Sequence, residues 1–169
     1  IRLVLIHPEL ELNFVYSSTK SGISLTNVHQ DLLGRTNLNF TSNVNLDVDI
    51  LYLCLGHGNS ISFLKEKVFN DKTLIIDLGN DFRLKNNQEF EGKKFIYGLP
   101  ELKRTSIKKS NAIANPGCFA TAVQLALLPL AKTQNLDSDV HVNATTGSTG
   151  AGVGLGPTSH FSWRNNNLS

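Results

Sequence analysis

The sequence predicts an α/β fold in which a doubly wound parallel sheet is followed by the start of an α+β domain. Two continuous apolar runs, at residues 49–55 and 73–78, are typical of strands that are buried on both faces of a parallel sheet. Between them, residues 60–68 form a short amphipathic segment, which predicts the helical crossover that parallel strands require. The organisation changes near residue 115, so we expect one domain at 1–115 and a second at 116–169.

Shorter elements are expected ahead of the first apolar run. Residues 1–7 predict the end of a helix, which Pro8 stops. The alternating, β-prone segment 11–16 predicts a strand. Residues 28–45 have no clear period and are predicted to be irregular.

Polar loops follow the predicted strands. In doubly wound sheets, ligands gather where parallel strands end, and residues 17–22, 56–60 and 79–83 occupy such positions. Asn59 or Ser60 is expected to cap the helix that begins there. These three loops are the first candidates for a binding site.

The second domain begins with a different pattern. Residues 119–128 combine apolar residues with good helix formers and predict a helix, which Pro129 follows. A strand is expected at 140–145, closed by the glycine-rich segment 147–152.

Composition excludes several classes of protein. The chain has 169 residues, of which 40% are hydrophobic and 18% charged, an ordinary globular mixture. Its formal net charge is only +2 and its basic residues are scattered, so no nucleic-acid-binding stripe is expected. No apolar stretch is long enough to span a membrane. No metal site is expected. Two cysteines form no disulfide framework and favour a reducing, cytoplasmic setting, with Cys54 interpreted as inert core.

The most informative segment is Asn-Pro-Gly-Cys at residues 115–118. A helix is predicted directly after this Pro-Gly turn, so Cys118 is expected in the helix's first turn, where backbone N–H groups lack hydrogen-bond partners within the helix. Their partial positive charge favours the thiolate over the thiol, which makes Cys118 a candidate nucleophile. The alternative is that Cys118 is a small buried hydrophobe, as a lone cysteine often is.

Four segments together resemble one known family, the N-acetyl-γ-glutamyl-phosphate reductases. They are residues 77–84, 97–101, 115–118 and 147–152, in the family's order and across nearly the whole chain. The resemblance implies a Rossmann-like NADP-binding domain followed by a catalytic and dimerisation domain, and a homo-oligomer. The related aspartate-semialdehyde dehydrogenases share the chemistry, but their motifs fit less well.

The resemblance also implies an activity. Members of this family are NADP-dependent oxidoreductases that reduce an acylglutamyl phosphate to the semialdehyde, a step in the synthesis of arginine or ornithine. Cys118 would displace phosphate from the acyl phosphate substrate and carry the acyl group as a thioester. The family's first Gly-rich turn and its downstream catalytic histidine have no counterpart in this sequence. We therefore expect an internal fragment with little or no turnover of its own.

Cofactor contacts are expected in three loops. NAD-specific sheets place an acidic residue after the second strand, and residues 15–22 contain none, so Ser17, Ser18 and Thr19 favour NADP(H). The alternative is an ordinary polar loop. The second candidate group is Gly56, His57 and Gly58, where His57 is interpreted as shaping the loop rather than as an acid or base. The third group consists of small residues that allow a ligand to approach the backbone: Gly147, Ser148, Gly150, Ala151 and Gly152. The alternative for this third group is that it forms only a flexible turn.

Substrate contacts are expected from Asn115, Arg83 and His160. The planar fork of Arg83 suits phosphate or carboxylate, but it would equally pair with Asp77 or Asp81 to hold the turn. His160 follows a Gly-Pro pair and is interpreted as a structural or substrate-contacting residue rather than the catalytic histidine. Three functions therefore remain: the acylglutamyl-phosphate reductase, an aspartate-semialdehyde dehydrogenase-like reductase, and an inactive binding module that keeps the fold.

Overall fold

The computed structural model describes residues 1–147 and residue 150 of the chain. The chain divides into two compact units, Ile1–Gly117 and Cys118–Ser169. Each unit is described by itself below.

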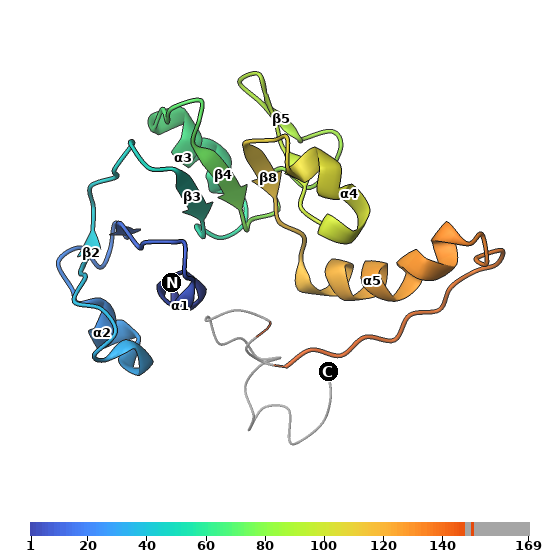
Figure 1. Ribbon diagram of the computed structural model, residues 1–169, viewed down its shortest axis with the longest axis horizontal. Coiled ribbons are helices and arrows are strands. Elements are labelled where there is room, and N and C mark those ends of the chain that lie inside the picture. The colour runs from blue at the N-terminus through green and yellow to red at the C-terminus, as the bar shows by residue number, and fades with distance from the viewer. Residues whose placement is uncertain (148–149, 151–169) are drawn as a thin grey trace. The chain divides into compact units, whose positions relative to one another are not determined.

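The first unit is built on a four-stranded sheet whose neighbours are all parallel (Figure 1). Its strand order is β3-β4-β8-β7, and its strands are β3 (Ile50–Leu53), β4 (Leu74–Asp77), β7 (Ile96–Tyr97) and β8 (Ala112–Ala114). The two apolar runs that predict buried strands supply β3 and β4. The predicted α/β fold with a parallel sheet is thereby confirmed.

Helices make the crossovers between these parallel strands. Helix α3 (Ser60–Glu66) connects β3 to β4, as predicted, and α4 (Pro100–Ile107) connects β7 to β8. Pro100 starts α4 because its missing N–H costs nothing in the first turn of a helix. The buried core against the sheet is mostly aliphatic and aromatic; it comprises Leu51, Leu53, Leu64, Phe69, Ile75, Phe82, Phe95, Ala112 and Ala114.

The N-terminal elements of this unit are short. Helix α1 (Arg2–Ile6) is where the sequence predicts a helix, but only Val15–Tyr16 of the predicted strand 11–16 forms β1. Its parallel partner is β2 (Phe40–Thr41). Two residues suffice because the pair continues through the backbone bond from Ser17 N–H to the Thr41 carbonyl, 2.9 Å.

The segment 28–45, predicted to be irregular, is partly regular. It holds the end of α2 (Leu25–Val28), the 3₁₀ helix η1 (Gln30–Leu32) and β2. The prediction was wrong there because elements of two to four residues leave no readable periodicity. A small hairpin, β5 (Glu89–Phe90) with β6 (Lys93–Lys94), was also not predicted.

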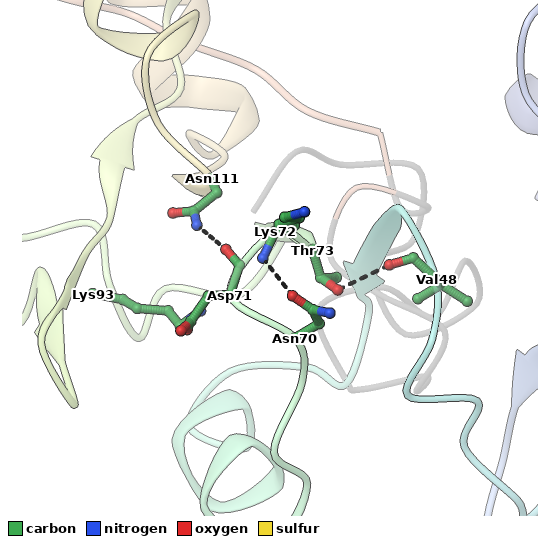
Figure 2. A network of polar contacts seen from close by, with 7 residues as sticks. All are labelled: Val48, Asn70, Asp71, Lys72, Thr73, Lys93 and Asn111. Atoms are coloured by element: carbon green, nitrogen blue, oxygen red, sulfur yellow. Dashed lines mark hydrogen bonds and ion pairs between the residues drawn. The ribbon is translucent and has the colours of Figure 1, made fainter.

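Polar contacts hold the strands at the edge of the sheet where β4 begins (Figure 2). The Thr73 hydroxyl donates to the Val48 carbonyl, 2.9 Å, just ahead of β3. The Asn111 side-chain amide donates to the Asp71 carbonyl, and Lys93 pairs with the Asp71 carboxylate at 3.0 Å. These contacts connect the starts of β3, β4 and β8. The candidate loops lie at the opposite edge of the sheet, where these strands end.

The second unit begins with helix α5 (Cys118–Lys132). Its start agrees with the sequence, but Pro129 does not end it as predicted. A proline near the last turn removes one backbone hydrogen bond, and the following turn still forms because Thr133 N–H donates to the Pro129 carbonyl at 3.2 Å. The helix then closes with Asn135 N–H donating to the Leu130 carbonyl, 2.9 Å.

The strand predicted at residues 140–145 is absent from the described part of the chain. The segment lies instead along α5, where Val140 and Val142 line a groove together with Phe119, Val123 and Leu127. A strand forms only with a hydrogen-bonding neighbour, and no described segment of the chain pairs with these residues. The alternating pattern was real, but the pairing it requires is missing.

Candidate functional site

The candidate site of the first unit lies where the sheet's strands end. In the register of the sheet, Leu53 lies opposite Asp77, and Asp77 lies opposite Ala114. The loops that follow β3, β4 and β8 therefore leave the sheet at the same level. They are residues 54–59, 78–83 and 115–117, which include two of the three loops predicted from the sequence and the turn before Cys118.

The loop after β3 presents open backbone. Gly56 and Gly58 have φ values of +82° and +81°, a conformation that suits glycine and few other residues. A Cβ atom at Gly58 would meet nothing within 4 Å, so a ligand has room to approach the backbone there. His57 between them is exposed. The Asn59 side chain donates back to the Leu55 carbonyl, 3.0 Å, and closes the loop.

A carboxylate from the next loop holds this loop in place. Asp81 accepts from Gly58 N–H at 2.9 Å and from Ile61 N–H, in the first turn of α3, at 3.4 Å. Asn59 is the N-cap residue of α3, one of the two that the sequence predicts, but its side chain makes no capping hydrogen bond. The cap comes from 20 residues downstream, which no local signal in the sequence reveals.

A second carboxylate is buried beside it. Asp77, at the end of β4, is 0% exposed; its Oδ1 accepts from the Ser60 hydroxyl at 2.6 Å and from Gly79 N–H at 3.0 Å. Its Oδ2 is buried and has no protein hydrogen-bond partner in the described part of the chain. Asp77 and Asp81 therefore bind the loops after β3 and β4 together, a function that the sequence analysis missed.

We expect Asp81→Ala to loosen the loop at Gly58. The substitution removes the acceptor of a part-buried N–H, so amide exchange at Gly58 should speed up by about 10- to 150-fold, which corresponds to the ~1.5–3 kcal/mol of a hydrogen bond to a charged group. Asp81→Asn keeps a side-chain oxygen and should recover much of the protection. Exchange measured by NMR tests this; equal exchange rates in all three proteins would contradict it.

Arg83 joins the ends of two strands. Its Nε donates to the Asn115 carbonyl at 2.8 Å, and its Nη2 donates to the Leu78 carbonyl at 2.9 Å. Within the described residues it forms no ion pair with Asp77 or Asp81, so the expected alternative of such a pair was wrong. Asp81 and the Oδ1 atom of Asp77 accept from N–H and hydroxyl donors, and the guanidinium donates to backbone carbonyls instead.

The turn before α5 presents the cysteine. Pro116 is buried, Asn115 donates its side-chain N–H to the Pro116 carbonyl at 3.1 Å, and Cys118 is the first residue of α5. The first N–H groups of a helix have no partner within the helix. Cys118 is exposed and has no disulfide partner. Its interpretation as a buried hydrophobe is therefore wrong, and its sulfur is accessible.

The loop after β1 is also accessible. The Ser17 hydroxyl accepts from Lys20 N–H at 3.2 Å, which closes a polar turn. Ser18, Thr19 and Lys20 are exposed on it. Of the predicted glycine-rich segment, Gly147 and Gly150 are described and exposed. The other predicted site residues, Ser148, Ala151, Gly152 and His160, lie outside the described residues.

Cys54 is exposed rather than core, which corrects the sequence interpretation. It is the first residue after β3, on the same side of the alternating strand as Tyr52, which is 42% exposed. Desolvation nevertheless raises the pKa of its thiol above the ordinary value, and the Asp77 carboxylate adds to the increase. The thiolate is the form that reacts.

The alkylation rate of Cys54 should therefore depend on pH differently from that of a free thiol. A raised pKa leaves less thiolate at a given pH, so at pH 8 Cys54 should be alkylated more slowly than a free cysteine, whose pKa is about 8.5. The rate for Cys54 should also continue to rise at pH values where the rate for a free cysteine levels off. Iodoacetamide labelling followed by mass spectrometry measures this. A profile identical to that of a model peptide would contradict it.

Two further surveys concern the described residues only. In residues 1–147 and 150, no helix has the length and apolar character needed to cross a membrane. In the same residues, no group of three or more His, Cys, Asp or Glu side chains is arranged to hold a metal ion.

Comparisons with known proteins agree with this geometry. The family model described as "Semialdehyde dehydrogenase, NAD binding domain" matches residues 1–110, and that described as "Semialdehyde dehydrogenase, dimerisation domain" matches residues 118–169. Relatives named N-acetyl-gamma-glutamyl-phosphate reductase match the whole chain: 62% identical in Flavobacterium johnsoniae, 56% in Christiangramia forsetii and 51% in Bacteroides thetaiotaomicron.

The match is unequal in length. It covers 100% of this chain but 52%, 51% and 52% of those three relatives. The chain thus spans about half the length of the curated relatives it matches. The resemblance inferred from the four motifs is confirmed. The chain belongs to the semialdehyde dehydrogenase family, and relatives named N-acetyl-gamma-glutamyl-phosphate reductase match it over its whole length.

Proposed function

We propose that this chain carries the nucleophile and much of the cofactor site of an NADPH-dependent N-acetyl-γ-glutamyl-phosphate reductase. The observation that carries the proposal is Cys118, exposed at the first residue of α5 directly after the Pro-Gly turn. The names of the relatives supply the substrate. The expected domains, 1–115 for the cofactor and 116–169 for catalysis and dimerisation, remain part of the proposal.

The chemistry begins at the Cys118 sulfur. The thiolate attacks the acyl-phosphate carbonyl carbon, and the carbonyl π electrons move to oxygen. Backbone N–H groups at the start of α5 stabilise this oxyanion, an interaction worth a few kcal/mol for each donor. The intermediate collapses, the C–O bond to phosphate breaks, and inorganic phosphate leaves a thioester on Cys118. Forming the thioester divides one difficult reduction into two easier steps.

The cofactor loops fit a nicotinamide dinucleotide. The backbone at Gly58 is open and His57 and Gly56 beside it are exposed, so a ligand can approach the loop at the carboxyl edge of the sheet. Ser18 and Thr19 are exposed, and residues 15–22 include no acidic residue that would repel a 2′-phosphate, which favours NADP(H). When bound, NADPH would supply the hydride that adds to the thioester carbonyl carbon. The resulting thiohemiacetal on Cys118 collapses to the semialdehyde: the carbonyl re-forms, the C–S bond breaks, and Cys118 leaves with its electron pair as the thiolate.

The remaining assignments complete the proposal. Asn115 lies in the turn before Cys118 and is assigned, with His160, to substrate contacts; Gly147, Ser148, Gly150, Ala151 and Gly152 are assigned to the cofactor. The product serves arginine or ornithine biosynthesis. The dimerisation-domain match favours a homo-oligomer. A cytoplasmic location is proposed because a free thiol nucleophile requires a reducing compartment.

The test requires a full-length enzyme. A chimera in which this chain replaces the matching 52% of the Flavobacterium johnsoniae relative provides one. In the reverse direction, with phosphate present, it should oxidise N-acetylglutamate semialdehyde with NADP⁺ much faster than with NAD⁺. Faster oxidation of aspartate semialdehyde would show the related dehydrogenase activity instead. Activity with neither aldehyde, in a folded chimera, would favour an inactive binding module.

A further inference from the structure

We propose that Arg83 is the positioning residue of the nucleophile: it holds the turn that leads into Cys118. This deepens the proposed function and rests on it, because it assigns a residue that acts on Cys118 through the backbone. It differs from the expected substrate contact of Arg83, in which the guanidinium itself would bind phosphate or carboxylate.

The first step is how the guanidinium is fastened. Two of its three nitrogens are used for carbonyls at strand ends: Nε donates to Asn115, just after β8, and Nη2 donates to Leu78, just after β4. Nε and Nη2 are held at a fixed spacing by the planar guanidinium, so both hydrogen bonds form only when the distance between the Asn115 and Leu78 carbonyl oxygens matches that spacing. Arg83 therefore fixes the start of the turn relative to β4.

The second step is what the guanidinium touches. A Cβ atom built at Gly117 would lie 3.1 Å from Nη1 of Arg83, closer than the 3.4–4 Å of ordinary contact. The guanidinium thus lies directly against the backbone of the residue before Cys118. Gly117 has no positive φ, so its backbone conformation would accept alanine. A methyl group there would require the Arg83 guanidinium to shift by a few tenths of an ångström.

The third step is the anchoring of Arg83 itself. The preceding residue, Phe82, is 1% exposed and stacks on Phe95 with ring centroids 3.8 Å apart and an interplanar angle of 8°. Asp81, one residue further back, holds the loop at Gly58. Arg83 therefore extends from a rigid segment, and it holds the turn rather than following its movements.

The consequence for Cys118 follows from the chain itself. Cys118 is bonded to Gly117, so the place of the turn limits where the Cys118 backbone can lie. A nucleophile that is misplaced by about 1 Å loses on the order of 100-fold in rate, since attack requires aligned atoms at contact distance. Arg83 thus affects the rate of acylation more than the affinity for substrate.

The kinetic test uses Arg83→Gln and Arg83→Lys in the chimera. Both variants lose the two-carbonyl fork, so kcat should fall by about 10–100-fold in both, with KM for the acyl phosphate changed by less than ~3-fold. Arg104→Gln, on the exposed face of α4, is the matched control and should leave both constants unchanged. A large rise in KM with kcat kept, or full rescue by lysine, would show that Arg83 binds the substrate and would overturn the proposal.

The structural test uses Gly117→Ala. In the unmodified chimera it should lower kcat by about tenfold, because the added methyl group displaces the guanidinium; in the Arg83→Gln chimera, which has no guanidinium to displace, it should cost less than ~2-fold. Additive losses would contradict the contact.

Amide exchange in the 169-residue chain provides a third readout. Arg83→Gln should speed exchange in residues 115–121 and leave α3 and α4 unchanged. Faster exchange throughout the sheet would mean that Arg83 is only a general structural residue, which overturns the proposal. Failure of the proposed function looks different: a Cys118→Ser chimera would then remain active, whatever residue stands at 83.

Discussion

Replacing Cys118 with serine in the chimera should lower kcat by about 10³–10⁶-fold, the range seen when an enzyme loses its covalent nucleophile. A neutral serine hydroxyl is a much weaker nucleophile than a thiolate, so it should attack the acyl phosphate far more slowly. The fold should be unaffected, because Cys118 is exposed and the change removes no packing. Steady-state NADPH oxidation measures kcat, and circular dichroism verifies folding.

The chain offers a matched control in its other cysteine. Cys54 is also exposed and has no disulfide partner, so Cys54→Ser makes the same chemical change at a residue to which the proposal assigns no contact with substrate or cofactor. It should retain most of the activity. If the two variants lost activity equally, the effect would come from general sensitivity to the change, and Cys118 would lose its assigned role.

Replacing Phe82 with alanine should lower the free energy of unfolding by about 3–5 kcal/mol, as expected for a buried aromatic residue in a well-packed core. Phe82 stacks on Phe95 and also packs against Phe90, with ring centroids 6.0 Å apart. Because Asp81 and Arg83 flank it, the cavity would also release the two side chains that hold the Gly58 loop and the Cys118 turn. Urea denaturation followed by circular dichroism gives the free-energy change.

Leu84, two residues further along, is the control for this effect. It is 68% exposed, so Leu84→Ala should change the free energy of unfolding by no more than about 0.5 kcal/mol. A Phe82→Ala loss as small as that of Leu84→Ala would show that the 77–83 segment is not anchored in the core. The account of a rigid segment beneath both loops would then be wrong.

The fold was predictable where the sequence carries long apolar patterns. β3, β4 and α3 were expected close to their actual bounds because continuous burial leaves an unbroken apolar run. β2, β5 and β7 are two residues long, and what makes them strands is a partner elsewhere in the chain. Residues 140–145 show the converse: a strand is expected from their sequence, but none forms because no described segment of the chain pairs with them.

The candidate site divides in the same way. The position of Cys118 at the start of a helix was predictable from the Pro-Gly turn and the helix formers after it. The partners of Arg83 and Asp81 were not, because backbone carbonyls and N–H groups carry no side-chain signal in a sequence. An arginine near two aspartates favours an ion pair, and only the folded chain reveals that those carboxylates already have other donors.

The central claim is that Cys118 becomes acylated, and the most direct measurement is to trap that intermediate. Incubating the chimera with N-acetyl-γ-glutamyl phosphate in the absence of NADPH leaves no hydride to carry the reaction further. Mass spectrometry should then find one acyl group for each chain, on the peptide containing Cys118 and not on that containing Cys54, with an equal amount of phosphate released. An active enzyme that releases phosphate only when NADPH is present, with Cys118 never acylated, would contradict the account.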